Sequence, residues 1–307
     1  MSRILFLPLL TIIILTTCSS RKSITKVDDQ PIDYDYRIEA YSGPKKKVAI
    51  TRFENATRFG KRRLGDHISD VLATELAKTN RFILLDRENV DKILEQVALS
   101  QSGLTEGDMN QIQMIDADFL LTGTVTHYAV TTTGSSSIFK KTKVQKAEVA
   151  ADVRLINTRT AEIILSKSGR GIAEKKFEQV MGMGETGGYD ESLEMDAFRA
   201  AVINVTENII KVIDEIPWSC DVVKIAGSKM YINAGKKSNI KIGDLMDVYQ
   251  KGDIIKNLSG SIIGYEEVLI TNGKVTNYVG EDGAILEIKP GIVLELPLTC
   301  KMHSSEE

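Results

Sequence analysis

The chain has 307 residues, 42% hydrophobic and 26% charged, which is typical of a globular protein with room for two domains. Its formal net charge of -3 argues against nucleic acid as the main partner. The three cysteines and three histidines are scattered without the spacing of a zinc site, so the sequence indicates no metal or other cofactor.

The first 17 residues predict a signal peptide. Arg3 precedes an apolar run, residues 4–15, that is too short to span a bilayer permanently but has the length of a signal-peptide core. The run ends in Leu15-Thr16-Thr17-Cys18, which resembles a bacterial lipobox. This resemblance implies that Cys18 is acylated and anchors the chain in membrane lipid. Ser19, in place of aspartate, implies the outer membrane, with the protein facing the periplasm. The alternative is an ordinary secretory signal with an incidental cysteine.

Residues 18–44 are predicted to be the lipidated N-terminus and a polar linker, because they show no helical period and few aliphatic side chains. A folded block begins at residue 45. It has strand patterns over residues 47–53, 81–85 and 118–126. Its first helix carries an apolar face made of Leu64, Ile68, Val71, Leu72 and Leu76.

A second helix is predicted after Asp86, which can cap it. Its apolar residues follow at helical spacing, namely Val90, Ile93, Leu94 and Val97. Thr105 then opens a capping box, so a third, short helix is expected before the strand at residues 118–126.

The sequence of this block resembles the CsgG family, named for the curli secretion lipoprotein. The resemblance rests on a strand ending in Phe53-Glu54-Asn55, a turn at Leu85-Asp86-Arg87, and Ala117-Asp118-Phe119-Leu120 running to Gly123. It implies an α/β (α+β) fold over residues 45–216, in which helices flank a mixed sheet. It also implies a homo-oligomeric ring with other envelope or secretion proteins as partners.

In the family, the loop after the first strand lines a constriction with tyrosine, asparagine and phenylalanine. The matching loop here spans residues 54–60. It contains Asn55 and Phe59 but no tyrosine, and these two residues are therefore the candidate constriction residues.

In the pore-forming member of the family, two further regions extend as hairpins, which a ring of subunits closes into a membrane barrel. The matching residues are 126–146 and 172–195. A membrane strand needs one continuous apolar face, and a lipid-facing lysine costs about 2–4 kcal/mol near the midplane. Both regions are crowded with charge, including Lys140, Lys141, Lys143, Lys146, Glu174, Lys175, Lys176 and Glu178. This favours shortened, soluble hairpins, with the membrane barrel as the alternative.

Residues 192–216 predict a long helix. Its apolar stripe repeats at spacings of three and four residues, through Met195, Phe198, Val202, Val205, Ile209, Val212 and Ile216. Such a stripe fits either a seam between subunits or a helix lying across its own sheet. Ile203, Ile210 and Ile213 widen the apolar face, which favours burial within one domain.

Residues 217–301 predict a small all-β barrel or sandwich domain, followed by a tail at 302–307, because short alternating runs are separated by glycine-rich turns. Asn233-Ala-Gly235 resembles part of the C-terminal domains of CsgG-like and flagellar T-ring-associated proteins. Cys220 and Cys300 bracket this domain. In an oxidising periplasm they can form a disulfide between its first and last strands, and two buried free thiols are the alternative.

No group of residues in the sequence points to an enzyme. Asp116 and Asp118 form a D-x-D pair, but strand alternation places both on one face near a helix end, where solvated carboxylates are common. The sequence therefore predicts a non-catalytic, lipid-anchored component of an outer-membrane secretion or assembly system. The rival hypothesis is a non-pore lipoprotein that scaffolds or regulates an envelope machine, such as a peptidoglycan synthase or a flagellar basal body.

Overall fold

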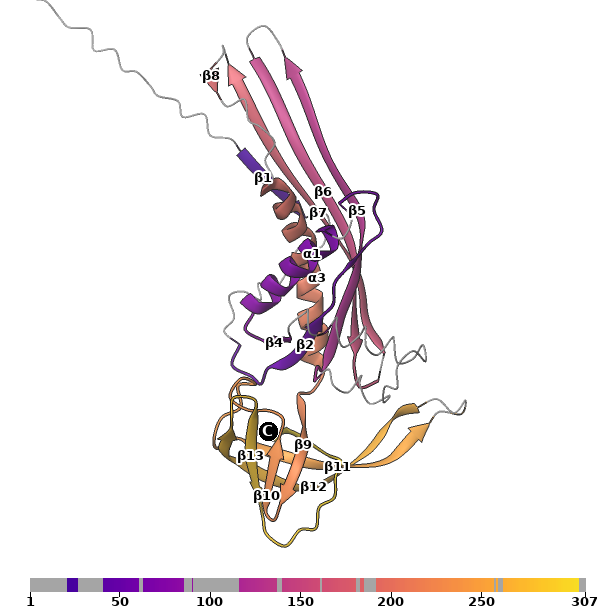
Figure 1. Cartoon of the computed structure of the whole chain (residues 1–307), viewed down its shortest axis with the longest axis vertical. Coiled ribbons are helices and arrows are strands. Elements are labelled where there is room, and N and C mark those ends of the chain that lie inside the picture. Colours follow the sequence, from indigo (N-terminus) through magenta and orange to yellow (C-terminus); the bar gives the residue numbers. More distant parts are fainter. Residues whose placement is uncertain are drawn as a thin grey trace, which may run out of the picture.

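The computed structural model shows a mixed α+β chain with two sheets, one above the other along the long axis of the molecule (Figure 1). It describes residues 21–26, 41–60, 63–85, 90, 116–136, 140–160, 162–180, 183–184, 192–256, 258 and 262–303. Three sequence predictions lie outside these residues, namely acylated Cys18, all but one residue of the helix after Asp86, and the capping box at Thr105.

The first sheet has eight strands, in the order β1-β7-β6-β5-β2-β4, with β3 beside β5 and β8 beside β7. The strand β2 runs parallel to β4 and β5, and β5, β6 and β7 form an antiparallel meander. The strands span β1 (Arg21–Lys26), β2 (Lys46–Ile50), β3 (Glu54–Asn55), β4 (Phe82–Leu85), β5 (Phe119–Ser136), β6 (Lys140–Asn157), β7 (Ile163–Val180) and β8 (Met183–Gly184).

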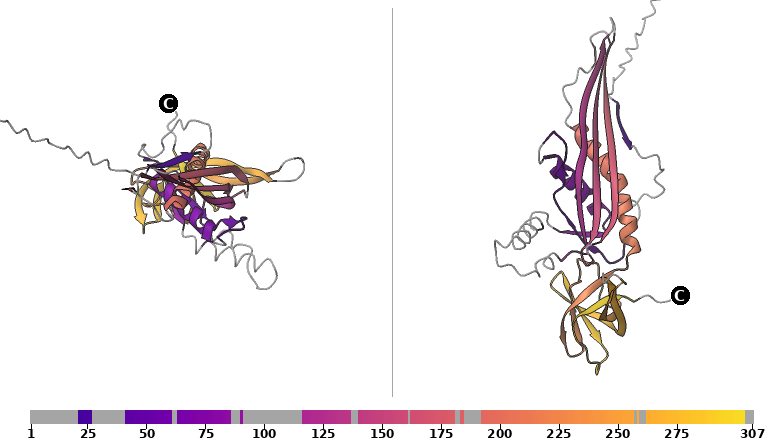
Figure 2. Two further views of the ribbon diagram at one scale, coloured as in Figure 1. Left: turned by 90° about the horizontal axis from the view of Figure 1, so that it is seen from above. Right: turned by 90° about the vertical axis from the view of Figure 1, so that its right-hand side faces the viewer.

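Helices α1 (Arg63–Lys78) and α3 (Ser192–Glu215) cover the same face of this sheet (Figures 1 and 2). The sheet residues below them alternate as expected for a strand, because Val149, Ala151, Val153 and Leu155 of β6 are all at most 3% exposed. The apolar stripe of α3 is buried in the same core. This confirms that the helix lies across its own sheet.

The C-terminal end of α3 is completed by a lysine from the sheet. The last turn of α3 contains no basic residue, and the Nζ of Lys46 on β2 donates to the carbonyl oxygens of Ile213 and Ile216. A cation at this place satisfies carbonyls that the helix leaves unpaired and opposes the negative end of the helix dipole. Burial lowers the pKa of Lys46.

The first predicted hairpin, residues 126–146, is not shortened, whereas the return arm of the second, residues 172–195, is described only as the two-residue strand β8. The strands β5, β6 and β7 have 18 residues each, which corresponds to about 60 Å of extended chain. Their outer halves reach well beyond the helices (Figure 1). Some of these charges are paired, since Glu148 of β6 forms ion pairs with Lys146 on its own strand and with Arg170 of β7. The threonines of residues 131–133 favour extended backbone.

The N-terminal segment contains a strand that the sequence analysis treated as linker. The strand β1 pairs antiparallel with β7, with Arg21 opposite Lys176 and Lys26 opposite Gly171. Because this pairing joins segments about 150 residues apart, no local pattern in the sequence reveals it.

The second sheet is a closed barrel in the order β10-β13-β12-β11-β14-β9. Met230, Val248 and Leu286 are fully buried in its core. The outer parts of β11 and β12 project from the barrel as an arm (Figure 1). That the barrel folds as a separate domain stays a prediction. Its strands are β9 (Ser219–Ala226), β10 (Lys229–Ile232), β11 (Leu245–Lys256), β12 (Ile262–Val279), β13 (Gly283–Ile288) and β14 (Leu298–Met302).

Candidate functional site

The first candidate site is the loop after β2, which is fixed against β5. In β3, Glu54 pairs with Thr124 and Asn55 with Val125. The side chain of Asn55 turns back into its own loop. Its Oδ1 accepts from the backbone N–H of Thr57 at 2.9 Å, and its Nδ2 donates to the carbonyl oxygen of Phe59 at 2.6 Å. Asn55 therefore shapes the loop, as asparagine often does in tight turns.

Phe59 is an aromatic residue of this loop that is available for contact, because it is 59% exposed. Its ring centroid lies 6.3 Å from that of Tyr128 on β5, and Tyr128 in turn lies 6.4 Å from buried Phe198 of α3. This row of rings connects an exposed aromatic to the core. Contacts of this kind hold an exposed ring in place.

The second candidate site is the outer edge of β5. Towards its beginning, β5 pairs with β2 through Phe119–Leu121 and with β3 as far as Val125. Beyond Val125, the part of the chain that the structure describes contains no strand next to this edge, although β6 pairs with the other side of β5 throughout. An unpaired strand edge presents backbone N–H and C=O groups to any further strand.

The face of the sheet opposite the helices is polar. Glu148 lies within 3.2 Å of an Arg170 nitrogen and forms an ion pair with Lys146. The hydrogen bond from Lys146, reinforced by Arg170, lowers the pKa of Glu148. On the same face, Ser168 donates to Asp152 at 2.5 Å. One side of the long sheet is therefore suited to water or to a polar partner.

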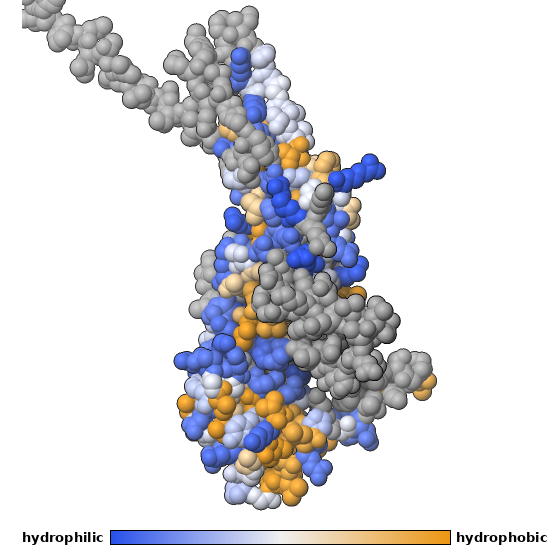
Figure 3. Space-filling model, in the orientation of Figure 1, coloured by the Kyte–Doolittle hydropathy of each residue, from blue (hydrophilic) through white to orange (hydrophobic). Residues whose placement is uncertain are grey.

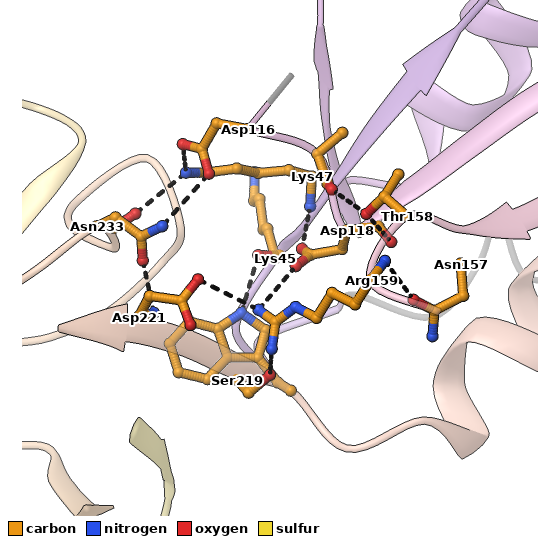
Figure 4. Close-up of polar contacts among 12 residues, drawn as sticks. Lys45, Lys47, Asp116, Asp118, Asn157, Thr158, Arg159, Ser219, Asp221 and Asn233 are labelled. Carbon is orange, nitrogen blue, oxygen red and sulfur yellow. Dashed lines mark hydrogen bonds and ion pairs between the residues drawn. The ribbon is translucent and has the colours of Figure 1, made fainter. Parts of the chain in front are cut away.

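A third cluster of polar residues joins the sheet to the barrel (Figure 4). Asp116 lies 2.5 Å from Nζ of Lys47, and its other carboxylate oxygen accepts from Nδ2 of Asn233 at 3.3 Å. The Lys47 ammonium also donates to the carbonyl oxygen of Asn233, at 3.1 Å. One side of this joint thus comes from β2 and the segment before β5, and the other from the segment after β10.

Asp118 and Arg159 form the inner part of the joint (Figure 4). Asp118 accepts from the backbone N–H of Lys47 at 2.8 Å. Arg159 approaches the carboxylates of Asp118 and Asp221 at 3.6 and 3.8 Å. Burial raises the pKa of Asp118, against the lowering effects of the Lys47 N–H and of Arg159. The view of this pair as solvated carboxylates is therefore wrong for Asp118, which serves the joint.

Backbone groups complete the joint. Trp218 Nε1 donates to the Lys45 carbonyl oxygen at 3.1 Å, and the Lys45 N–H donates to Ser238 O at 2.9 Å. The side chain of Asn239 donates to the carbonyl oxygens of Ser42 and Gly43. The barrel therefore holds the chain just before β2, where the folded block begins.

Cys220 and Cys300 lie directly opposite each other on β9 and β14, at the place where the first and last barrel strands meet. Both are buried free thiols in this structure. The neighbouring Cys300 and burial raise the pKa of the Cys220 thiol well above its ordinary value. The disulfide stays a prediction, but the register places the two residues as a bridge would need them.

Among the described residues, no helix is both long and apolar enough to cross a membrane. The described part of the chain also contains no group of three or more histidine, cysteine, aspartate or glutamate residues arranged to hold a metal ion.

Comparison with known proteins decides the family. The family model of the curli production assembly/transport component CsgG matches residues 33–242, which is about two thirds of the chain. The chain belongs to the CsgG family. The match covers the first sheet from β2 onward, helices α1 and α3, and the barrel strands β9 and β10.

A curated relative in Neisseria meningitidis serogroup B, named "Putative lipoprotein NMB1126/NMB1164", is 26% identical over 216 residues. The match covers 66% of this CsgG-family chain and 91% of the relative. Among solved structures, lipoprotein GNA1162 of Neisseria meningitidis is 16% identical with a TM-score of 0.28, covering 56% of this chain and 99% of that one. The PelC dodecamer of Paraburkholderia phytofirmans is 11% identical with a TM-score of 0.26, covering 59% and 96%. Structural similarity of this size gives no basis for a functional comparison.

The CsgG resemblance led us to look for a tyrosine, an asparagine and a phenylalanine in the loop after β2. The structure places Asn55 and Phe59 in that loop, with different roles, and brings in Tyr128 from β5 as the aromatic neighbour. No local pattern points to Tyr128, because it lies 69 residues after Phe59. A constriction role for Asn55 and Phe59 stays a prediction.

Proposed function

We propose that this CsgG-family protein is a lipid-anchored component of the outer membrane that faces the periplasm and assembles into a homo-oligomeric ring of a secretion or assembly system. In this proposal it acts by binding and assembly, without catalysis. Family membership, the lipobox-like sequence at Cys18 and the lipoprotein name of the Neisseria relative support the anchor. The polar joint supports a non-catalytic role, because it engages the only D-x-D carboxylates that the sequence singled out.

The observation that carries the ring is the open edge of β5. Residues 126–136 have β6 on one side, and no described strand on the other. The opposite border of the same sheet is formed by β1 and β8. If the edge of β5 in one copy pairs with the opposite border of the sheet in the next copy, the contact is head-to-tail. Repeated by a rotation that closes, such contacts form a ring.

Proline substitutions can test this edge. Successive strand residues point their N–H groups to opposite sides, so one of Thr131 and Thr132 faces β6 and the other faces the open edge. Proline removes the N–H and is tolerated only where no strand bond is lost. We expect one of Thr131→Pro and Thr132→Pro to keep the wild-type melting temperature yet lose the oligomer, and the other to lower the melting temperature.

The measurement is native mass analysis of the purified protein in detergent. A wild-type protein that stays a strict monomer at micromolar concentration would rule out the ring. If both folded variants kept the wild-type mass, the contact would lie elsewhere than at the edge of β5.

The anchor is tested separately in cells. We expect palmitate to label the wild-type chain but not Cys18→Ser, and globomycin to block processing of the precursor. Unchanged processing together with absent labelling would show that residues 1–17 are an ordinary secretory signal.

The rival function, a non-pore lipoprotein that scaffolds or regulates an envelope machine, is favoured by the arm of the barrel. Ile255, Leu258 and Leu269 on and beside this arm are 46%, 110% and 56% exposed. Several exposed apolar side chains along one projecting arm suit contact with a protein partner. Discrete current steps in planar bilayers would favour a pore-forming ring over this rival, and native mass analysis in detergent detects a ring that does not conduct.

A further inference from the structure

The end of the first sheet farthest from the barrel is strongly basic, although the whole chain carries a formal charge of -3. In this basic end we include β1 and residues 131–136, 140–148 and 172–180 of the three long strands. It contains three carboxylates (Glu148, Glu174, Glu178) and nine basic residues: Arg21, Lys22, Lys26, Lys140, Lys141, Lys143, Lys146, Lys175 and Lys176.

Cations lie on both faces of this end. Lys143 and Lys175 lie with their Nζ atoms 5.7 and 5.1 Å from the ring of Phe177, on the face that continues the helix-covered side. By strand alternation, Lys146 and Lys176 lie on the opposite face. The strands therefore present no continuous apolar face at this level, which a strand in hydrocarbon needs. Lysines on both faces suit the polar headgroup layer instead.

The register of β1 places this end next to the membrane. Cys18 precedes Arg21 by three residues, and Arg21 pairs with Lys176. Three residues span at most about 11 Å. This step rests on the proposed acylation of Cys18, because only then does the bilayer surface lie within that distance of the lysines. The barrel lies at the other end of the molecule (Figures 1 and 2).

The surface colouring agrees with this orientation. The outermost part of the sheet is mainly polar, whereas apolar residues gather over the barrel (Figure 3). Anionic lipid headgroups attract lysines that lie within a Debye length, about 8–10 Å, of the surface.

We propose that the basic end is a docking surface for anionic phospholipid headgroups. It holds the long strands upright on the bilayer and keeps the barrel away from it. Electrostatic contact of this kind adds a second attachment to the single acylated residue and fixes the direction in which the edge of β5 faces a neighbouring copy.

Vesicle binding tests the proposal without the acyl chain. The protein is the chain from Ser19 onward, which keeps every described element. The probes are vesicles of phosphatidylcholine alone and vesicles that also contain about 30% phosphatidylglycerol, both at low and high salt. We expect binding only to the anionic vesicles and its loss at high salt, because the attraction is screened.

Matched variants locate the binding surface. Each lysine near an anionic surface strengthens binding about fivefold, so Lys141→Gln, Lys143→Gln and Lys176→Gln together should weaken it about a hundredfold. The control removes the same charge from exposed lysines of the barrel and its loops, with Lys229→Gln, Lys241→Gln and Lys289→Gln. It should change binding less than threefold. Thermal unfolding confirms that both variants fold, and Lys176→Gln alone replaces the triple variant if that one does not.

Equal weakening in the two triple variants would overturn the proposal, since net charge alone would then explain it. So would equal binding to both kinds of vesicle. Loss of the oligomer with unchanged vesicle binding would assign the lysines to a contact between copies instead. A negative result here leaves the palmitate experiment unaffected, so failure of the docking surface and failure of the anchor are distinguishable.

Discussion

The two sheets of this chain differ in whether every strand is paired on both sides. In the barrel each of six strands pairs with two neighbours, and a core that includes Met230 and Leu286 fills the interior. In the first sheet no described strand pairs with the outer edge of β5 beyond Val125, and α1 and α3 cover one face. A closed sheet leaves no edge for another strand. Strand pairing with a further copy is therefore expected at the open sheet, whereas the arm of the barrel offers exposed apolar side chains instead.

The largest expected effect is stabilisation of the barrel by a disulfide between its first and last strands. Residues directly opposite in an antiparallel pair have Cα atoms about 4.5–5.5 Å apart, which a disulfide can bridge. Oxidised glutathione should therefore join Cys220 to Cys300, with both thiols losing their protons and two electrons passing to the glutathione disulfide. A loop of this length gives roughly 4 kcal/mol in the entropy model. We expect a higher urea midpoint for the barrel after oxidation.

The measurement follows Trp218 fluorescence during urea unfolding with oxidised or reduced glutathione. Cys220→Ser should show no shift between the two. In the reduced native protein, iodoacetamide should react slowly with both buried thiols, and the raised pKa of Cys220 keeps it protonated at neutral pH. Rapid alkylation of these thiols in the native protein would show that the pairing between β9 and β14 opens readily.

The next largest effect is expected from a substitution that disrupts the packing of α3 on the open sheet and leaves the barrel unchanged. Helix α3 lies so close to β7 that a Cβ at Gly171 would come within 2.0 Å of the Ala197 carbonyl oxygen, and one at Gly169 within 2.2 Å of that of Ala201. Gly171→Val must push the helix off the sheet. We expect a loss of about 3 kcal/mol in unfolding free energy, at the upper end for overpacking.

Gly134→Val is the matched control, because a Cβ there would meet no atom closer than 3.6 Å. It should change stability by less than about 0.5 kcal/mol. Hydrogen exchange followed by mass spectrometry would show whether Gly171→Val loosens β6 and β7 while β9–β14 stay protected. Equal loosening of both sheets would show that they unfold as one unit.

The parts of the first sheet that carry a buried face could be predicted from the sequence. Period-two alternation located β6 and its inward residues, and the apolar stripe located α3, because burial imposes these patterns. The outer halves of β5, β6 and β7 were underestimated. Residues 131–136 of β5 are all exposed, so burial imposes no pattern on them, and the charges of β6 and β7 mask the alternation of Gln145, Ala147, Ala173 and Phe177.

The candidate site was predictable only in part, for a related reason. Asn55 and Phe59 could be named because the resemblance to the CsgG family points to the loop that contains both. Tyr128, the β1–β7 pairing and the joint between Asp118, Arg159 and Asp221 depend on contacts between distant segments. Such contacts follow from strand register, which a single sequence does not reveal.

The smallest expected effect concerns two carboxyl groups, one in the joint and one on the open sheet, whose pKa values shift in opposite directions. Burial raises the pKa of Asp118 above its ordinary 3.8, so its ionised form opposes folding, and this cost fades as the pH falls through the raised value. The bond from Lys146 lowers the pKa of Glu148 below 4.5, so its contribution is present at neutral pH and is lost as the pH falls through the lowered value.

We therefore expect Asp118→Asn to be more stable than the wild type at neutral pH and to lose that advantage in acid. Glu148→Gln should be less stable than the wild type at neutral pH and should become equal to it in acid. Both differences should stay below about 1 kcal/mol, since partly exposed ion pairs contribute little. Urea unfolding as a function of pH measures them. If the stability difference from the wild type changed with pH in the same direction for both variants, Asp118 and Glu148 could not have oppositely shifted pKa values. That result would contradict the different environments described for these two carboxyl groups.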